Sequence, residues 1–109
     1  MKMIKAIIRP ERVEAVKEAL ESSGIAGLTV YDVMGRGAQK GLSINGGKTR
    51  VDLLPKTCIE TVVEDSDEMK AVSAITAAAR TGKIGDGRIF VMPVGTAVRI
   101  RTAVAQATV

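Results

Sequence analysis

The chain repeats one pattern in its two halves: a short strand, an amphipathic helix and a second strand. The strands are predicted at residues 2–8 and 28–34 in the first half, and at 57–63 and 88–92 in the second. Two βαβ units of this size predict an α+β fold, the ferredoxin-like double βαβ sandwich, in which one antiparallel sheet carries both helices on one face. A fifth short strand is expected at residues 97–101.

Both predicted helices have an apolar face. Pro10 opens the first helix at a position where its missing N–H is not needed. The second helix is expected to start with Asp65 as cap and Glu68 in the manner of a capping box, and to end with Arg80 in its last turn and Gly82 as cap. The buried positions recur at helical spacing and comprise Val13, Val16, Ala19 and Leu20, then Met69, Val72, Ile75 and Ala79.

The 109 residues are enough for one domain, 1–109, with a hydrophobic share of 46% to build a core. The chain contains no His, which excludes His-based triads and the usual His-containing zinc sites. The single cysteine, Cys58, lies in an apolar run and is interpreted as a core thiol. Charged residues interrupt every apolar run well short of a membrane span, and no signal-peptide pattern opens the chain. We therefore expect a cytoplasmic protein without direct membrane insertion.

Between the second and third strands, residues 36–55 lose the periodicity of helix and strand. A loop this long inside a compact domain is usually functional, and Asn45-Gly46-Gly47 is a good turn signal for its tip. We expect a mobile, partner-binding loop. The tail, residues 103–109, is small and aliphatic and receives no assignment. Because no element remains to cover the second face of the sheet, we also expect a homo-oligomer packed sheet to sheet.

A glycine-rich turn at residues 81–87 follows the second predicted helix. Gly82, Gly85 and Gly87 allow positive φ and close approach to a ligand, and successive N–H groups in such a turn can face an anion. Downstream, strand alternation at residues 98–101 predicts Arg99 and Arg101 on one face. Together these features favour a phosphate cradle over a simple helix end.

Two other function classes remain as alternatives. A formal net charge of +4 suits a basic nucleic-acid-binding module, but the cations are dispersed, and Tyr31 and Phe90 are the only aromatic residues available for stacking on bases. A nucleotide hydrolase would need a Walker loop, and no Gly-Lys-Ser/Thr sequence follows four spacer residues here. We expect neither an enzyme nor nucleic-acid binding.

Several long motifs in order give the chain a specific resemblance. The turn and the strand after it, residues 81–91, with Arg99-Ile100-Arg101-Thr102 downstream, closely resemble the C-terminal signature of the PII nitrogen-signalling proteins. Residues 1–10, 35–41 and 52–56 resemble the same family. The resemblance covers residues 1 to about 102.

The resemblance implies a homotrimer of ferredoxin-like subunits that binds ATP or ADP in the clefts between subunits. With ATP and Mg²⁺, the site also takes up 2-oxoglutarate. The residues implied at the phosphates are Gly85, Asp86, Gly87, Arg88, Arg99 and Arg101. Those implied near the adenine are Thr29, Glu60 and Val62, and Gly35 and Gly37 belong to the same nucleotide site.

By the same resemblance, Gln39 would ligate the Mg²⁺ of ATP and touch 2-oxoglutarate, and Lys56 would pair with the distal carboxylate of 2-oxoglutarate. An amide oxygen is a hard ligand that suits Mg²⁺, and a lysine ammonium is a compact charge that suits a carboxylate.

Three departures from the family pattern bear on function. Ala38 replaces an arginine that often helps hold the terminal phosphate, and Arg88 replaces a frequent lysine. The loop is shorter than in the common bacterial form and lacks the tyrosine that many members have uridylylated, which is closer to nitrogenase-associated or divergent branches. The implied targets are an ammonium transporter, glutamine synthetase or nitrogenase. A divergent PII-like sensor of another small molecule is the alternative within the family.

Overall fold

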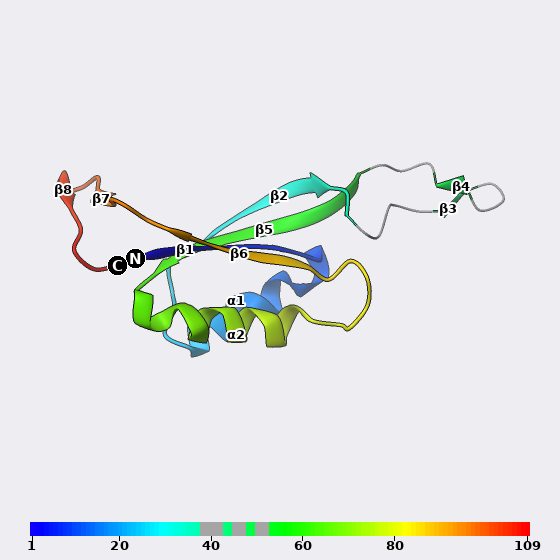
Figure 1. Ribbon diagram of the computed structural model, residues 1–109, viewed down its shortest axis with the longest axis horizontal. Coiled ribbons are helices and arrows are strands. Elements are labelled where there is room, and N and C mark those ends of the chain that lie inside the picture. Colours follow the sequence, from blue (N-terminus) through cyan, green and yellow to red (C-terminus); the bar gives the residue numbers. More distant parts are fainter. Residues whose placement is uncertain (38–42, 45–47, 50–52) are drawn as a thin grey trace.

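The computed structural model of the chain describes residues 1–37, 43–44, 48–49 and 53–109. Its main sheet has four antiparallel strands in the order β2-β5-β1-β6, and both helices lie on one face of it (Figure 1). The strands of this sheet are β1 (Lys2–Ile8), β2 (Thr29–Gly35), β5 (Leu54–Val63) and β6 (Gly87–Pro93). The helices are α1 (Val13–Ser22) and α2 (Glu68–Ala79), each preceded by a short 3-10 turn, η1 (Pro10–Arg12) and η2 (Asp65–Asp67). The ferredoxin-like α+β prediction is confirmed.

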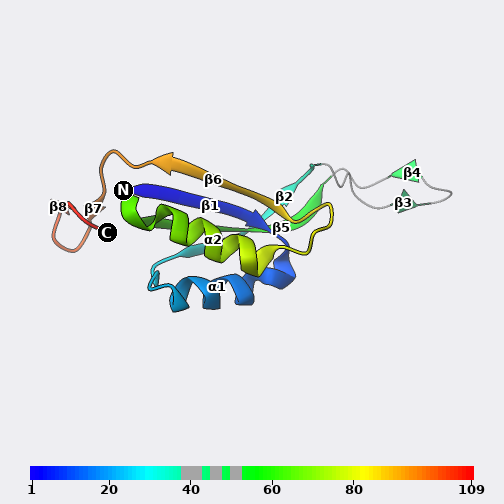
Figure 2. The ribbon, with the colours of Figure 1, turned by 60° about the horizontal axis from the view of Figure 1, so that its bottom comes forward.

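The core lies between the sheet and the two helices, which Figure 2 shows on one side of the sheet. On β1, Ile4, Ala6 and Ile8 are at most 1% exposed, and they pack with side chains of β5, α1 and α2. Alternation along the strand requires one side chain in two to face the helices, and the buried ones do so. Each fully buried aliphatic side chain stabilises the fold by about 1.5–3 kcal/mol. The other core members on these elements are Ile59, Val63, Val16, Leu20, Ala71, Ile75 and Ala79.

Among the residues that the structure describes, no helix lies over the opposite face of the sheet. By the register of β1 with its neighbours, Met3, Lys5 and Ile7 point to that face, and Phe90 and Met92 of β6 pair with Lys5 and Met3. Phe90 is 43% exposed and Met92 is 39% exposed. Large apolar side chains on an uncovered sheet are typical of a surface that packs against another protein chain.

The ends of the second helix differ from the prediction. No side-chain hydrogen bond caps η2 or α2, and the Asp65 carboxylate instead accepts a hydrogen bond from the Met1 amino group at 3.0 Å. The capping box was therefore wrong. At the other end α2 stops at Ala79, so Arg80 is not in the last turn but is the extended C-cap residue, and Gly82 lies beyond it with φ +87°.

Met69 is also not part of the buried face of α2. The buried stripe is Ala71, Ile75 and Ala79, spaced four residues apart, with Val72 packed against its edge. Met69 precedes Ala71 by two positions, which places it about 200° around the helix, and it is 71% exposed.

The remaining elements are two short two-stranded ladders. Strands β3 (Ser43–Ile44) and β4 (Lys48–Thr49) pair in antiparallel fashion, and β7 (Val98–Arg99) pairs with β8 (Val104–Ala105). Strand β7 is shorter than the predicted 97–101, because the chain turns after Arg99. The tail contains β8, which the sequence did not predict. In the described part of the chain, neither α1 nor α2 has the length and apolar character needed to cross a membrane.

Candidate functional site

The glycine-rich turn joins α2 to β6 and adopts the backbone conformations expected of its glycines. Gly82, Gly85 and Gly87 have φ values of +87°, +103° and +102°. These values are accessible to glycine at low cost and strained for other residues. The prediction of positive φ at these three positions is confirmed.

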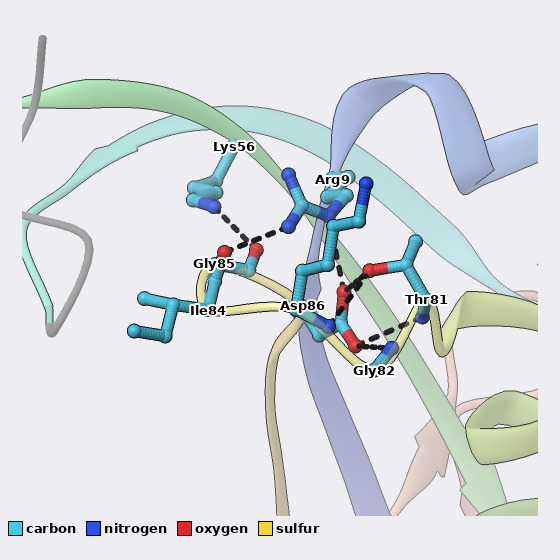
Figure 3. A network of polar contacts seen from close by, with 8 residues as sticks. Arg9, Lys56, Thr81, Gly82, Ile84, Gly85 and Asp86 are labelled. Atoms are coloured by element: carbon cyan, nitrogen blue, oxygen red, sulfur yellow. Dashed lines mark hydrogen bonds and ion pairs between the residues drawn. The ribbon is translucent and has the colours of Figure 1, made fainter.

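The carboxylate of Asp86 organises the turn (Figure 3). Its Oδ2 accepts hydrogen bonds from the backbone N–H groups of Thr81 at 2.9 Å and Gly82 at 2.8 Å, and its Oδ1 accepts one from the Thr81 hydroxyl at 2.5 Å. The Thr81 hydroxyl, with these N–H groups and the Arg9 guanidinium, holds the pKa of the Asp86 carboxyl far below its usual value, although partial burial acts in the opposite direction. Asp86 is therefore ionised at neutral pH, and its oxygens serve to close the turn.

Two cationic side chains from outside the turn, Arg9 and Lys56, donate hydrogen bonds to its carbonyl oxygens. Arg9, directly after β1, donates from Nη2 to the Ile84 carbonyl at 2.8 Å and from Nε to Asp86 Oδ1 at 3.1 Å. Lys56 of β5 donates from Nζ to the Gly85 carbonyl at 2.7 Å. Burial lowers the pKa of Lys56, and the nearby charge of Arg9 lowers it further, while Glu11 and Asp86 raise it. The turn is thus fastened to the ends of two central strands.

Gly87 brings the end of the turn into direct contact with the backbone of β1. A Cβ atom built at Gly87 would lie 1.7 Å from the carbonyl oxygen of Ile7 and 2.8 Å from the Ile7 carbonyl carbon. No other residue fits this position without moving one of the two strands. This close approach of the two backbones fixes the position of the turn relative to Arg9, which is two residues beyond Ile7.

The three residues expected near adenine lie together on β2 and β5, toward the end of the sheet away from the glycine turn. Thr29 of β2 is paired with Glu60 of β5, and Val62 follows two positions along β5, on the same face as Glu60. They line an open pocket of about 320 Å³ whose other members are Met3, Gly27, Leu28, Thr61 and Val109. The Val109 backbone N–H donates a hydrogen bond to the Glu64 carboxylate beside this pocket.

The arginines predicted at the phosphates are not brought together within one chain. Arg88 is an exposed residue at the start of β6, beside the turn, whereas Arg99 lies in β7, beyond the other end of β6 (Figure 1). Strand β6 alone separates these ends by roughly 20 Å. The alternation predicted for Arg99 and Arg101 was wrong, because Arg101 belongs to the turn between β7 and β8, where Ala103 has a φ of +55°.

The remaining predicted site residues lie at the base of the long loop. Gly35 ends β2, and a Cβ at Gly35 would be 3.9 Å from Cγ of Lys56. A Cβ at Gly37 would meet nothing within 4 Å. Gln39, predicted for Mg²⁺ and 2-oxoglutarate, and Ala38 lie outside the described residues, as does the tip of the predicted mobile loop.

Sequence reasoning missed the roles of Arg9 and Thr81. Their contacts with the turn could not be found from spacing, because Arg9 is 77 residues from Asp86 along the chain. The available signal was chemical: an acidic residue between two glycines, Gly85 and Gly87, requires hydrogen-bond donors close by when the turn is folded. The same argument could have predicted Thr81, five residues earlier, as a hydrogen-bond donor to Asp86.

The chain is thus a small ferredoxin-like α+β protein in which hydrogen bonds from Arg9, Lys56 and Thr81 hold a glycine-rich turn in place. The family model described as nitrogen regulatory protein P-II matches residues 1–104. Nitrogen regulatory protein P-II 2 of Methanothermobacter thermautotrophicus is 55% identical over 104 residues, which cover 94% of this chain and 90% of that protein. The P-II proteins of Azospirillum brasilense and Cereibacter sphaeroides are 53% and 51% identical, each over 94% of this chain and 93% of their own length.

The chain belongs to the nitrogen regulatory protein P-II family. The resemblance noted from its motifs is confirmed. Members of this family are named as regulatory proteins, so the chain is a regulator of nitrogen metabolism and not an enzyme.

Proposed function

We propose that the chain binds ATP or ADP, takes up 2-oxoglutarate when ATP and Mg²⁺ are bound, and reports these ligands to a target protein of nitrogen assimilation. The observation that carries this proposal is the hydrogen bond from Lys56 Nζ to the Gly85 carbonyl, 2.7 Å long. It joins the residue expected to hold 2-oxoglutarate to the turn expected to hold phosphates. An ammonium group has three N–H donors, so Lys56 can keep Gly85 and still receive a carboxylate.

The nucleotide site is proposed to lie between copies of the chain in a homotrimer. The glycine turn precedes β6 at the end of the sheet where Ile8 pairs with Gly87, whereas Thr29, Glu60 and Val62 lie toward the other end, and Arg99 lies beyond that end of β6. In one chain the turn is therefore too far from Arg99 for both to contact one nucleotide. The uncovered apolar face of the sheet supports packing of further copies against it.

In this site the phosphates would meet backbone N–H groups and arginines, not the Asp86 carboxylate. That carboxylate is held by Thr81, Gly82 and Arg9, so Asp86 would contact an anion through its backbone N–H. Arg88 of one copy and Arg99 and Arg101 of its neighbour would supply the positive charge, with the bidentate geometry that guanidinium groups offer to phosphate.

The amide oxygen of Gln39 is the proposed protein ligand of the Mg²⁺ that accompanies ATP, since Mg²⁺ commonly combines few protein ligands with phosphate oxygens. The loop that contains Gln39 is the proposed contact for the target, which we place in the cytoplasm and among ammonium transporters, glutamine synthetase and nitrogenase. Ligands could alter that contact only by binding one state of the protein more tightly than the other.

Calorimetric titration of the purified protein tests the proposal. The expected result is binding of ATP and of ADP, and binding of 2-oxoglutarate only when ATP and Mg²⁺ are present. Nucleotide binding without any 2-oxoglutarate response would mean that the effector is another small molecule. Absence of nucleotide binding by the assembled protein would overturn the proposal.

A further inference from the structure

Arg9 makes two contacts to the glycine turn from outside it. Its side chain is 17% exposed and that of Asp86 is 23% exposed, so both are largely shielded from water where they meet. The guanidinium bridges Asp86 Oδ1 at 3.1 Å and the Ile84 carbonyl at 2.8 Å (Figure 3). We infer that Arg9 is a positioning residue for the nucleotide phosphates: it orients the N–H groups of the turn and balances the charge of Asp86 without touching the phosphates itself. This inference rests on the proposed nucleotide site.

The first part of the argument is the geometry of the peptide bond. A trans peptide is planar, with its C=O and N–H pointing in opposite directions, and the described residues contain no cis peptide. Because Arg9 holds the Ile84 carbonyl, the N–H of Gly85 must point away from Arg9. Lys56 holds the Gly85 carbonyl in the same way, so the N–H of Asp86 must point away from Lys56. Two successive N–H groups with fixed directions are the arrangement that binds anions in glycine turns.

The second part is charge. The Asp86 carboxylate is ionised and lies within the turn that is proposed to receive phosphates, where an uncompensated negative charge would repel them. The Arg9 guanidinium, bonded to Oδ1, places a positive charge next to this carboxylate. Arg9 therefore lets Asp86 close the turn through Thr81 and Gly82 at little electrostatic cost to anion binding.

The third part is the fixed base from which Arg9 acts. Ile8 is paired with Gly87, and the missing side chain of Gly87 leaves the turn in contact with the Ile7 carbonyl. Arg9 follows directly on Ile8, so its backbone has a set distance to the turn. Because the backbone of Arg9 and the turn are both held in place, the Arg9 side chain can fix the orientation of the groups that it contacts.

The test measures ADP affinity by calorimetry in the full-length protein carrying Arg9→Gln, Arg9→Lys or Arg12→Gln. Losing one charge-assisted contact predicts about a tenfold weaker ADP affinity for Arg9→Gln. Arg9→Lys keeps the charge but cannot bond the carbonyl and the carboxylate with a planar fork, so it should bind ADP nearly as weakly. Arg12→Gln removes the same charge from the neighbouring 3-10 turn and should bind like the wild type. Wild-type ADP affinity in Arg9→Gln, or full recovery in Arg9→Lys, would overturn the inference.

A double-mutant cycle separates positioning from direct contact with phosphate. If Arg9 acts through Asp86, Arg9→Gln should weaken ADP binding less in an Asp86→Asn background than in the wild type. An equal loss in both backgrounds would mean that Arg9 does not act through Asp86, and would overturn the charge-balancing part of the inference.

Amide hydrogen exchange of the ligand-free proteins gives a second readout. The Gly82 N–H, which donates to Asp86, should exchange faster in Arg9→Gln while the β1 and β5 amides stay protected. Unchanged Gly82 exchange in a variant with weakened binding would also contradict positioning. If Arg9→Gln does not fold, Arg9→Lys serves in the exchange measurement and in the cycle. If the wild type itself binds no nucleotide, the proposed function fails and not this inference alone.

Discussion

Lys56 and Gly85 are 29 residues apart in the chain, and the Lys56 ammonium lies 2.7 Å from the Gly85 carbonyl oxygen. Strand β5 and the glycine turn are joined at this point. A ligand that binds Lys56 therefore acts on a residue already in contact with the turn.

Replacing Lys56 should separate the two proposed ligands. Lys56→Met removes the charge that would pair with the distal carboxylate of 2-oxoglutarate, so the 2-oxoglutarate response with ATP and Mg²⁺ should be lost. ADP affinity should fall by less than about tenfold, because only one orienting hydrogen bond is missing from the turn. Calorimetry measures both, with Lys17→Met, which removes a charge paired with Glu14 on α1, as the matched control. The proposed role of Lys56 would be contradicted if the variant lost ADP binding as fully as 2-oxoglutarate binding, or if it lost neither.

The close approach at Gly87 predicts a large loss of stability on Gly87→Ala. The added Cβ would overlap the Ile7 carbonyl, and the residue would keep a positive φ, so we expect a decrease of about 2–5 kcal/mol in the free energy of unfolding. Gly24→Ala is the matched control: Gly24 has a φ of +83° with nothing within 4 Å of its Cβ position, and strain alone should cost about 1–2 kcal/mol. Urea denaturation measures both variants, and equal losses would show that the overlap at Gly87 is relieved at no cost.

The lowered pKa of Asp86 predicts a specific pH dependence. A carboxylate whose pKa is lower in the folded than in the unfolded protein stabilises the fold at pH values above its unfolded pKa of about 3.9, and this contribution is lost as the pH falls below that value. Wild type should therefore be more stable than Asp86→Asn at neutral pH, and the difference should shrink in acid. Urea midpoints between about pH 7 and about pH 3 measure it.

Asp65, whose pKa is lowered by the Met1 amino group, is present in both proteins and cancels from the comparison. A stability difference between wild type and Asp86→Asn that stays constant with pH would contradict the role of the ionised Asp86 carboxylate.

The separation of the arginines from the turn predicts complementation between chains. In the proposed homotrimer, with each nucleotide site shared between two copies, the Arg101→Ala and Arg88→Ala proteins should each bind ADP weakly. When the two chains are unfolded together and reassembled, every mixed trimer contains a cleft in which an intact turn meets an intact Arg101 from its neighbour. Tight ADP binding should therefore return in the mixed sample. Native mass spectrometry would verify mixing, and mixed trimers without recovered ADP binding would contradict a site shared between copies.

The sequence was sufficient to predict the strands and helices of the fold, because these elements depend on local patterns of residues. The short apolar run at residues 2–8 predicted a strand, and the helical spacing of apolar residues ending at Ile75 and Ala79 predicted the buried face of a helix. The structure confirms both elements. The three glycines at residues 82–87 located the turn in the sequence, and they explain its backbone conformation.

The errors arose where a distant or terminal group took the place of a local partner. Asp65 looked like a helix cap, but the Met1 amino group is a charged donor that competes for the same carboxylate. Arg99 and Arg101 alternated like strand residues, but β8 pairs with β7 and requires the chain to reverse between them. The contacts of Arg9 span more than 70 residues and depend on the sheet register, which no local pattern contains.

The glycine turn and the β7–β8 hairpin lie beyond opposite ends of β6 in the main sheet (Figure 1), and this separation has a thermodynamic consequence for the proposed site. If a cleft requires both ends, from different copies, then nucleotide binding and subunit association are linked: each must strengthen the other. ADP in excess would hold copies together, and dilution would lower the apparent affinity for ADP. The cellular abundance of the chain would then set its sensitivity, alongside the levels of nucleotide and 2-oxoglutarate.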